Sequence, residues 1–277
     1  MLKLSEVLNR FNLSAQVFYA GDVCGTLAFE QASPLEGHMH LIKQGRLDIR
    51  AGDAWAYVIE RPSLVFMARS QQHQLRAQVE AGAQVVCASI LYGVGNNNPL
   101  ANAFPPALVL PLDEDPRLAF VCHWLFDEAF AELEGRQLAI NRLAELLVLQ
   151  MLRHLVERAS LQTGMLAGLA HPHLHRALLA IHSNPAHSWS LMELASLSGM
   201  SRSKFAEEFK TVLGQPPGDY LIEWRLGVAQ SLLQKLKPVG LVAHEVGYEN
   251  ASVLARVFRK KLGLTPLEWL ERQRELG

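Results

Sequence analysis

The sequence has no apolar run of about 18 residues, the length that would suggest a transmembrane helix. Cysteine is scarce: Cys24, Cys87 and Cys122 are too few and too far apart for a disulfide framework. This favours a reducing compartment, and we expect a cytoplasmic protein with no membrane partner. Residues 1–11 carry an acidic side chain and no long apolar core, so we expect no signal peptide.

Net charge is nearly absent as well. The 277 residues contain 26 Lys+Arg and 27 Asp+Glu, a formal charge of −1, which argues against a general nucleic-acid coat. The charges are unevenly placed, because residues 171–277 hold 13 basic and 10 acidic side chains. Any DNA affinity should therefore depend on individually placed contacts and on the pairing of two copies of the chain.

The length suits two compact domains. Residues 12–110 are predicted to be short strands separated by Gly, Pro, Asp and Ser, as in a sandwich or barrel. Periodic helices follow, at about 116–160. We therefore expect an N-terminal domain over 1–161, a Gly- and Pro-containing linker over 162–173, and a second domain over 174–277.

A repeated pattern dominates the second domain. In the first copy the shared positions are Ala195, Gly199, Phe205, Phe209, Gly214, Pro217 and Tyr220. In the second copy they are Ala243, Gly247, Leu254, Phe258, Gly263, Pro266 and Trp269, with one residue inserted after Gly247. Each copy predicts a helix, a glycine turn and a second helix, which is the pattern of a DNA-binding helix-turn-helix. Two copies predict contact with two neighbouring groove segments.

The second helix of the first copy places polar side chains opposite its apolar stripe. Phe205 and Phe209 are expected to face the core, and Ser201 is expected to cap the helix. The outward residues Ser203 and Glu207 suit base edges. The basic residues beside them suit phosphates, and they are Arg202, Lys204 and Lys210.

The second copy has the same arrangement. Leu254 and Phe258 are expected to face inward, and Asn250 is the expected cap. Ser252, Arg256 and Arg259 point outward, and Lys260 is expected to contact the backbone of DNA. Arg256 is the residue expected to read guanine, because its planar fork matches O6 and N7. A charged helix face is often only a solvated surface, but the duplicated spacing favours DNA binding.

These motifs resemble the AraC/XylS family of bacterial transcription regulators over residues 174–272. The resemblance rests on runs that begin at Trp189, Gly199, Gly214, Tyr220, Val246 and Phe258, and the run from Tyr220 includes Arg225. It implies two helix-turn-helix subdomains joined by a rigid helix and docked on one face of DNA. Carried over by position, it assigns base contacts to Ser203, Ala206, Glu207, Ser252, Ala255 and Arg256.

The second copy departs from the family pattern at its first helix. Pro238, Gly240 and Leu241 stand where a Ser-type cap, a helix former and an acid are usual. Gly lowers the stability of a helix by about 1 kcal/mol relative to Ala. We therefore expect the second copy to have the same fold as the first but to bind DNA more weakly.

The N-terminal domain resembles the cupin-type sensor domain found in part of the same family. The supporting residues include His38-Met-His40, Gly45 and Gln72-His73. The resemblance implies a small β-barrel with a pocket, followed by helices that often mediate dimerisation. The predicted fold class is therefore α+β and multidomain: a cupin-like β-barrel with a helical extension, then an all-α domain of two helix-turn-helix subdomains.

The histidines of this domain have two interpretations. His38 and His40 share one face of a strand, and with His73 on a neighbouring strand they could hold zinc, iron or manganese. A quartet of Cys24, His40, His73 and Cys87 is a zinc-like alternative. The simpler interpretation is that His38 is exposed in a turn and that His40 and His73 hydrogen-bond within the barrel. The position where catalytic cupins usually carry a Glu is here near Gln44. On balance we expect no cofactor.

A small-molecule pocket is the other expectation for the barrel. Its candidate lining residues are His40, Trp55, Tyr57, Phe66 and His73, although aromatic residues in such positions are more often simple core.

Together these features predict a sequence-specific transcription regulator, and not an enzyme. Its cupin-like domain would sense a small effector, mediate dimerisation, or both. The expected partners are double-stranded promoter DNA, a second copy of the chain, an unidentified effector and, for an activator, RNA polymerase. The leucine-rich helix at 141–158 is expected both to pack on the barrel and to form a dimer seam. The alternatives are a metal-dependent cupin enzyme fused to a DNA-binding module, and a constitutive regulator whose first domain is only a scaffold.

Overall fold

The structure is a computed structural model that describes residues 13–30, 36–69, 71–91, 101, 104–158, 161 and 163–276. Two compact units are present. The N-terminal unit consists of Leu13–Asn96 and Leu100–Arg158, and the C-terminal unit includes Ala159–Gly277. None of the helices in the described ranges is both long and apolar enough to cross a bilayer.

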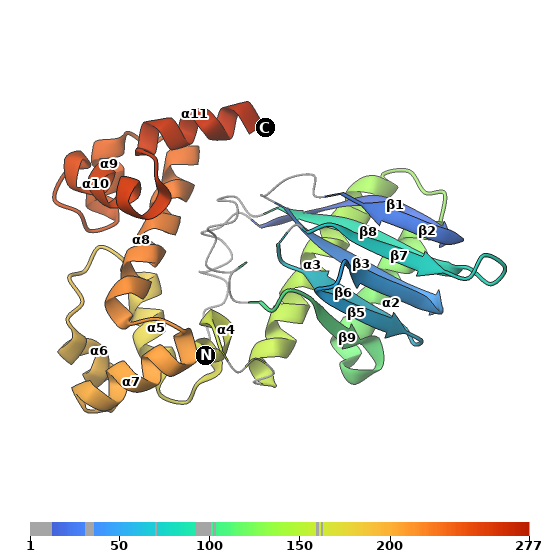
Figure 1. The fold of residues 1–277 in the computed structure, drawn as a ribbon, viewed down its shortest axis with the longest axis horizontal. Coiled ribbons are helices and arrows are strands. Elements are labelled where there is room, and N and C mark those ends of the chain that lie inside the picture. Colours follow the sequence, from blue (N-terminus) through green and yellow to red (C-terminus); the bar gives the residue numbers. More distant parts are fainter. Residues whose placement is uncertain are drawn as a thin grey trace. The chain divides into compact units, whose positions relative to one another are not determined.

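Two antiparallel sheets form the N-terminal unit (Figure 1). The first sheet contains, in order, β1 (Ser14–Val23), β8 (Ala83–Leu91), β3 (Glu36–Gly45), β6 (Ser63–Met67) and β9 (Leu108–Pro111). The second sheet contains β2 (Gly25–Phe29), β7 (His73–Ala77), β4 (Leu47–Ala51) and β5 (Trp55–Ile59).

Alternate side chains of both sheets meet in one apolar core. Ile42 and Val65 enter it from the first sheet, and Ile49 and Leu75 enter it from the second; all four are buried. Because successive residues of a strand point to opposite faces, the register of β3 directs His38 and His40 to the same side as Ile42. The sheet pairing thus places the imidazole rings of His38 and His40 in an apolar interior.

The helical extension follows the last strand. A short 3-10 helix, η3 (Leu112–Glu114), leads into α2 (Pro116–Phe130), and α3 (Arg136–Glu157) returns beside it. The leucine-rich face of α3 is core packing, since Leu143, Leu147, Met151 and Leu155 are all buried. Large exposed aromatic side chains lie instead on α2, where Phe120 is 68% exposed and Trp124 is 52% exposed.

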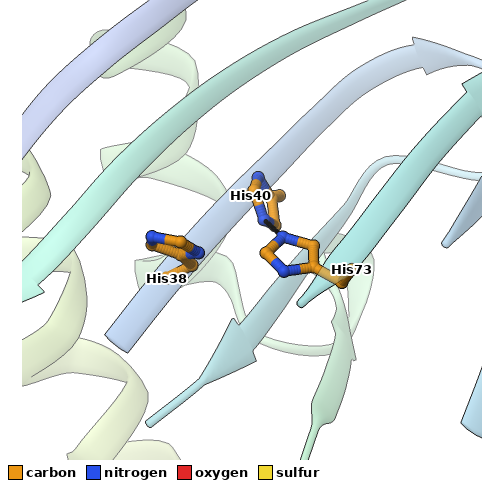
Figure 2. A group of neighbouring side chains, drawn as sticks. All are labelled: His38, His40 and His73. Atoms are coloured by element: carbon orange, nitrogen blue, oxygen red, sulfur yellow. Dashed lines mark hydrogen bonds between the residues drawn. The ribbon is translucent and has the colours of Figure 1, made fainter. Parts of the chain in front are cut away.

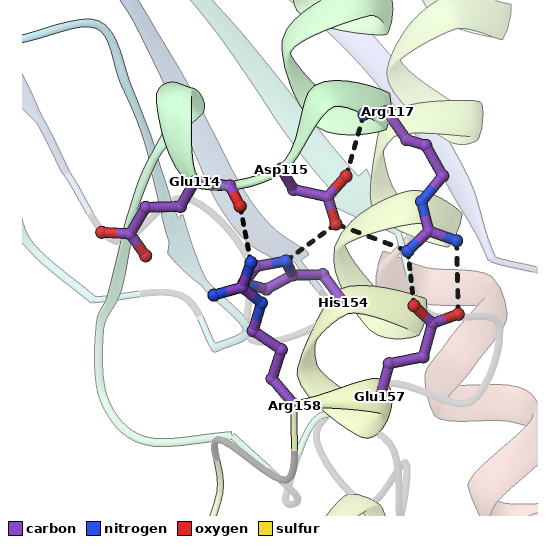
Figure 3. Close-up of polar contacts among 6 residues, drawn as sticks. All are labelled: Glu114, Asp115, Arg117, His154, Glu157 and Arg158. Atoms are coloured by element: carbon purple, nitrogen blue, oxygen red, sulfur yellow. Dashed lines mark hydrogen bonds and ion pairs between the residues drawn. The ribbon is translucent and has the colours of Figure 1, made fainter.

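A polar network ties the start of α2 to the end of α3 (Figure 3). Asp115 caps α2 by accepting from the backbone N–H of Arg117, and its Oδ2 lies 2.9 Å from Nδ1 of buried His154. Arg117 also pairs with Glu157. Burial alone would raise the pKa of Asp115, but hydrogen bonds from His154 and Arg117 outweigh it and lower that pKa to about 2.

In the described residues of the C-terminal unit, the regular elements are all helices. Its helices are α4 (Met165–Ala170), α5 (Leu174–Ser183), α6 (Leu191–Leu197), α7 (Arg202–Leu213), α8 (Pro217–Gln234), α9 (Val239–Glu245), α10 (Ala251–Leu262) and α11 (Pro266–Leu276). Helix α8 packs against α7 on one side of the unit and against α9 and α11 on the other (Figure 1). It is the rigid connecting helix that the family resemblance implies.

The segment expected to be a linker differs from that expectation. Residues 165–170 form α4, which packs on α5 and α7, and the N–H of Gly164 donates to the carbonyl of Val212. Gly168 allows the close approach, because a Cβ there would lie 2.6 Å from a methyl group of Leu178. In a segment that its glycine and proline content marked as a linker, Gly168 instead serves tight packing within the C-terminal unit.

Candidate nucleic-acid interface and buried histidine cluster

The first helix-turn-helix, here the first module, consists of α6 and α7. Ser190 and Glu193 form a capping box at the start of α6, and hydrogen bonds from Ser190 lower the pKa of Glu193 to about 2. Gly199 turns the chain with φ of 65°, a left-handed conformation that favours glycine. Ser201 then caps α7 by accepting from the N–H of Lys204. Local sequence therefore sets the direction of α7.

The outer face of α7 presents the predicted contacts to solvent. Phe205 and Phe209 are fully buried against the rest of the unit. On the opposite side Arg202, Ser203, Lys204, Glu207 and Lys210 are exposed, and Ala206 is half-buried. Among the described residues, no carboxylate forms an ion pair with Arg202, Lys204 or Lys210, which leaves these charges available to phosphates.

The second module consists of α9 and α10. Asn250 caps α10, with its Oδ1 3.0 Å from the N–H of Val253, while Pro238 gives α9 no side-chain cap. Leu254 and Phe258 are buried. The other predicted residues lie on the outer surface: Ser252, Arg256, Arg259 and Lys260 are exposed, and Ala255 is half-buried. The structure thus brings the predicted residues of each module onto one helix face.

Two of the basic residues of α10 have partners within the unit. Arg259 lies 3.4 Å from Glu268, and Lys261 lies 3.4 Å from Asp219. No such ion pair is present for Arg256 or Lys260 within the described part of the chain. Of the two arginines of α10, Arg256 is thus the exposed one that forms no ion pair in the described residues.

A contact that the sequence did not predict joins the two modules. Arg225 of α8 donates from Nε to the carbonyl of Pro185, at 2.8 Å, and from Nη2 to the carbonyl of His187, at 3.0 Å. Its guanidinium also stacks on Tyr248, 5.4 Å from the ring centre. Arg225 stood in the family motif, but its partners lie far away in the sequence, so spacing alone gave no signal of this role.

Three histidines meet inside the N-terminal unit (Figure 2). His38 and His40 extend from β3, and His73 extends from β7 of the other sheet. All three are buried, and one ligand nitrogen from each lies within 4.8 Å of the others. Nε2 of His40 is 2.8 Å from Nε2 of His73, whose Nδ1 is 2.8 Å from the carbonyl oxygen of Gln71. We call these residues the histidine cluster.

Burial keeps the histidine cluster neutral. It lowers the pKa of His38, lowers that of His40 well below the usual value, and lowers that of His73 to about 4. The alternative quartet with Cys24 and Cys87 does not form in the described residues. Cys24 is exposed and Cys87 is buried in the core, and neither lies within the group of ligand atoms.

Four of the five residues expected to line an effector pocket are linked by contacts, since Nε1 of Trp55 donates to Oε1 of Gln71, whose backbone carbonyl oxygen lies 2.8 Å from Nδ1 of His73. His40 and His73 are in contact, and Trp55 and Tyr57 lie side by side on the edge strand β5. Phe66 was wrongly placed with them: it lies on the opposite face of β6, where its ring contacts Phe104. A surface pocket of about 860 Å³ lies elsewhere, lined by Gly25, Thr26, Arg46, Asp48, Arg76, Ala77, Gln78, Val79 and Glu80.

Comparison with known proteins agrees with this geometry. The chain matches the model of a Cupin family over residues 3–157 and that of a Helix-turn-helix domain over residues 194–272. An AraC-like transcription regulator of Streptomyces lividans is 33% identical over 208 residues, which cover 73% of this chain and 68% of that protein. The chain belongs to the AraC-like transcription regulators. The predicted fold class and family of this AraC-like regulator are confirmed.

Further similarities cover different shares of the chain. A second AraC-like transcription regulator, from Streptomyces antibioticus, is 37% identical over 173 residues. This match covers 60% of the chain but only 56% of the relative, so the chain spans little more than half of that protein's length. A crystal structure of ToxT from Vibrio cholerae with a bound unsaturated fatty acid covers 93% of this chain and 94% of its own, at 13% identity and a TM-score of 0.42.

Proposed function

We propose that this chain is a sequence-specific transcription regulator that reads two neighbouring major-groove segments of promoter DNA with α7 and α10. The observation that carries the proposal is the pair of capped helices joined through α8, each with aromatic or aliphatic residues buried on one side and polar residues exposed on the other. Arg256 would specify a guanine, and Lys204 would contact phosphate.

The N-terminal unit would sense a small effector, mediate dimerisation, or do both. Phe120 and Trp124 support a self-association surface, because exposed aromatic pairs are enriched at interfaces. A dimer would raise affinity for paired sites, which matters for a chain with little excess positive charge. For an activator, RNA polymerase would be a further partner. Because the proposed target is promoter DNA, the regulator would work in the cytoplasm.

No catalytic role is part of the proposal. The curated relatives are named as transcription regulators. In the described residues no acidic side chain lies in the histidine cluster to act as a general acid or base beside it.

The test is binding of the full chain to the DNA upstream of its own gene, measured by fluorescence anisotropy and footprinting at fixed salt. We expect protection of two segments about one helical turn apart on one face of the duplex. A shuffled sequence of the same composition is the control. Equal affinity for both duplexes across a range of salt concentrations would contradict sequence-specific reading.

A further inference from the structure

We propose that the first module binds a small uncharged aromatic molecule in an apolar pocket beside α7, and that an occupied pocket keeps DNA off that helix. The pocket has a volume of about 320 Å³ and lies between α6, α7 and the start of α8. Trp189 and Leu191 line it where α6 begins, Ala206 lines it on α7, and Pro217 and Gly218 line it on α8. Competition with DNA rests on the proposed function, whereas the binding site does not depend on it.

The walls of the pocket disfavour a charged ligand. No charged side chain in the described part of the chain lines it. Among the described lining residues only Trp189 has a polar side-chain atom, and its Nε1–H already donates to the backbone carbonyl of Asn184 at 3.0 Å. A charged group would lose its hydration there without gaining a side-chain partner, which is costly. The walls therefore favour an uncharged, apolar ligand.

The volume of the pocket limits the size of that ligand. An apolar cavity of about 150 Å³ binds benzene, and ligand pockets in proteins begin at roughly 300 Å³. At about 320 Å³, this pocket matches a two-ring aromatic molecule such as naphthalene or indole. Trp189 lines one wall, and contacts between aromatic rings add to the gain from burial.

Apolar surface around the pocket is exposed to solvent. Leu191, in its wall, is 41% exposed, and the next residue, Met192, is 64% exposed. An added Cβ atom at Gly218 would meet no atom within 4 Å, so this side of the pocket is open. Exposed apolar surface around a concave site is typical of ligand-binding grooves. An apolar ligand that covers this surface would bind favourably, because it removes that surface from water.

Ala206 links the pocket to DNA binding. It lines the pocket, and it is also one of the residues that the family resemblance assigns to base contact. Ser203 and Lys210 lie three residues before and four residues after it, on the same face of α7, and both are exposed. An aromatic molecule in contact with Ala206 would therefore occupy space beside the surface on which a base pair would lie. Ligand and DNA would then compete for α7.

The second module provides an internal comparison. The repeat places Lys237 at the position of Trp189 and Leu267 at the position of Gly218. A lysine brings a charge to the place of the aromatic wall, which disfavours an uncharged aromatic ligand. The comparison also suggests a variant, Gly218→Leu, which gives the first module the side chain that the second carries. Gly218 lies in α8 without a positive φ, and a helix tolerates leucine better than glycine.

The test uses the full chain and N-phenyl-1-naphthylamine, an uncharged dye that fluoresces when it enters an apolar site. We expect the native chain to bind the dye. Uncharged 2-naphthol should displace it at least about tenfold better than the anion 2-naphthalenesulfonate, since the pocket offers an anion no partner. A dye that 2-naphthalenesulfonate displaces equally well would contradict the uncharged ligand class.

Two variants assign the dye to this pocket. Gly218→Leu should weaken dye binding by roughly tenfold or more, because its side chain takes up part of the space. Leu191→Gln, which makes an exposed part of the wall polar, should weaken it as well. Gly240→Leu is the matched control and should bind the dye as the native chain does. Gly240 is a helical glycine of α9, in the other module, and an added Cβ there also meets no atom within 4 Å.

Dye binding that is unchanged in both Gly218→Leu and Leu191→Gln would place the dye elsewhere, as in the N-terminal unit, and would overturn the site. A native chain that does not bind the dye would also overturn it.

The effect on DNA is measured on the DNA upstream of the chain's own gene. Saturating 2-naphthol should lower the affinity of the native chain by about tenfold or more, within the usual range of coupling between sites, and should have no such effect on Gly218→Leu. An affinity that does not respond to 2-naphthol, in a chain that binds the dye in this pocket, would overturn the competition with DNA. A chain that binds the dye but does not prefer this duplex to the shuffled control would contradict the proposed function and support the binding site alone.

Discussion

Gly247 packs directly against Arg225. A Cβ atom on Gly247 would lie 2.7 Å from Nη2 of Arg225 and 2.7 Å from the carbonyl oxygen of Ala186. The turn of the second module therefore rests on the helix that serves both modules and on the chain segment before the first one. This contact fixes how the two recognition helices, α7 and α10, are oriented relative to each other.

Gly247→Ala should consequently cost more stability than the same change in the other turn. Both turn glycines have positive φ, 84° at Gly247 and 65° at Gly199, so each alanine pays about 1–2 kcal/mol for a left-handed conformation. Only Gly247 adds a clash with backbone, which should cost roughly 1–3 kcal/mol more.

Gly199→Ala is the matched control, because nothing lies within 4 Å of its added methyl group. Urea denaturation of both variants measures the difference. Equal losses of unfolding free energy would show that the contact with Arg225 and Ala186 is not close in solution.

Arg256→Ala should weaken DNA binding by about 1–3 kcal/mol and should relax the preference at one base pair. The physical reason is the loss of a bidentate guanidinium on the exposed face of α10. Competition against duplexes substituted at each position would locate that base pair. Arg259→Ala is the comparison, since Arg259 already lies 3.4 Å from Glu268. An unchanged footprint in Arg256→Ala would mean that α10 docks differently.

Lys204→Ala should weaken binding evenly on all sequences, because phosphates carry no base information. The slope of log affinity against log salt should fall in magnitude by about 1. Lys235→Ala, at the end of α8 and outside both recognition helices, should leave that slope unchanged. A loss confined to one operator variant would instead assign Lys204 to base reading.

Asp115→Asn should reduce stability at neutral pH and should flatten its acid dependence. The pKa of Asp115 is about 2 in the fold against 3.8 ordinarily, so its ionised form favours folding. That contribution, about 2 kcal/mol, is nearly complete above about pH 5 and is lost as the pH falls toward about 2.

The substituted amide would keep a side-chain oxygen for the helix cap, so the variant chiefly removes the charge beside His154. Asp113→Asn is the control, because Asp113 is exposed and pairs only with Arg61 among the described residues. Thermal denaturation between about pH 2 and 7 should separate Asp115→Asn from both the native chain and this control. Parallel curves for all three would contradict the network in Figure 3.

The helix-turn-helix modules were predictable because their signals are local. Ser190 and Ser201 begin their helices through hydrogen bonds that span three residues, and Phe205 and Phe209 are about one helical turn apart. The role of Arg225 was not predictable, since its carbonyl partners lie about 40 residues away. The burial of α4 was also not predicted from the sequence. Glycine occurs both in flexible backbone segments and at positions where two elements pack closely, so its presence does not distinguish the two.

The sheets were harder to predict than the helices. The strand runs were recognisable, but every residue of β6 from Ser63 to Met67 is buried, so alternation could not tell which face holds Phe66. The pairing of β3 with β6 and β8 decides that face. His73 reaches His40 from the other sheet, and such a contact depends on how the sheets pack and not on spacing along the chain.

Helix α8 packs against α7 of the first module and against α9 of the second, and it is the continuous helix that connects the two modules. One extra base pair rotates a B-form groove by roughly 34–36° about the duplex axis, given about 10–10.5 base pairs per turn. A continuous helix pinned at its middle by Arg225 has no joint to follow that rotation. The spacing between the two half-sites of the operator should then matter as much as their base sequence. Insertion of a single base pair between the half-sites should abolish binding.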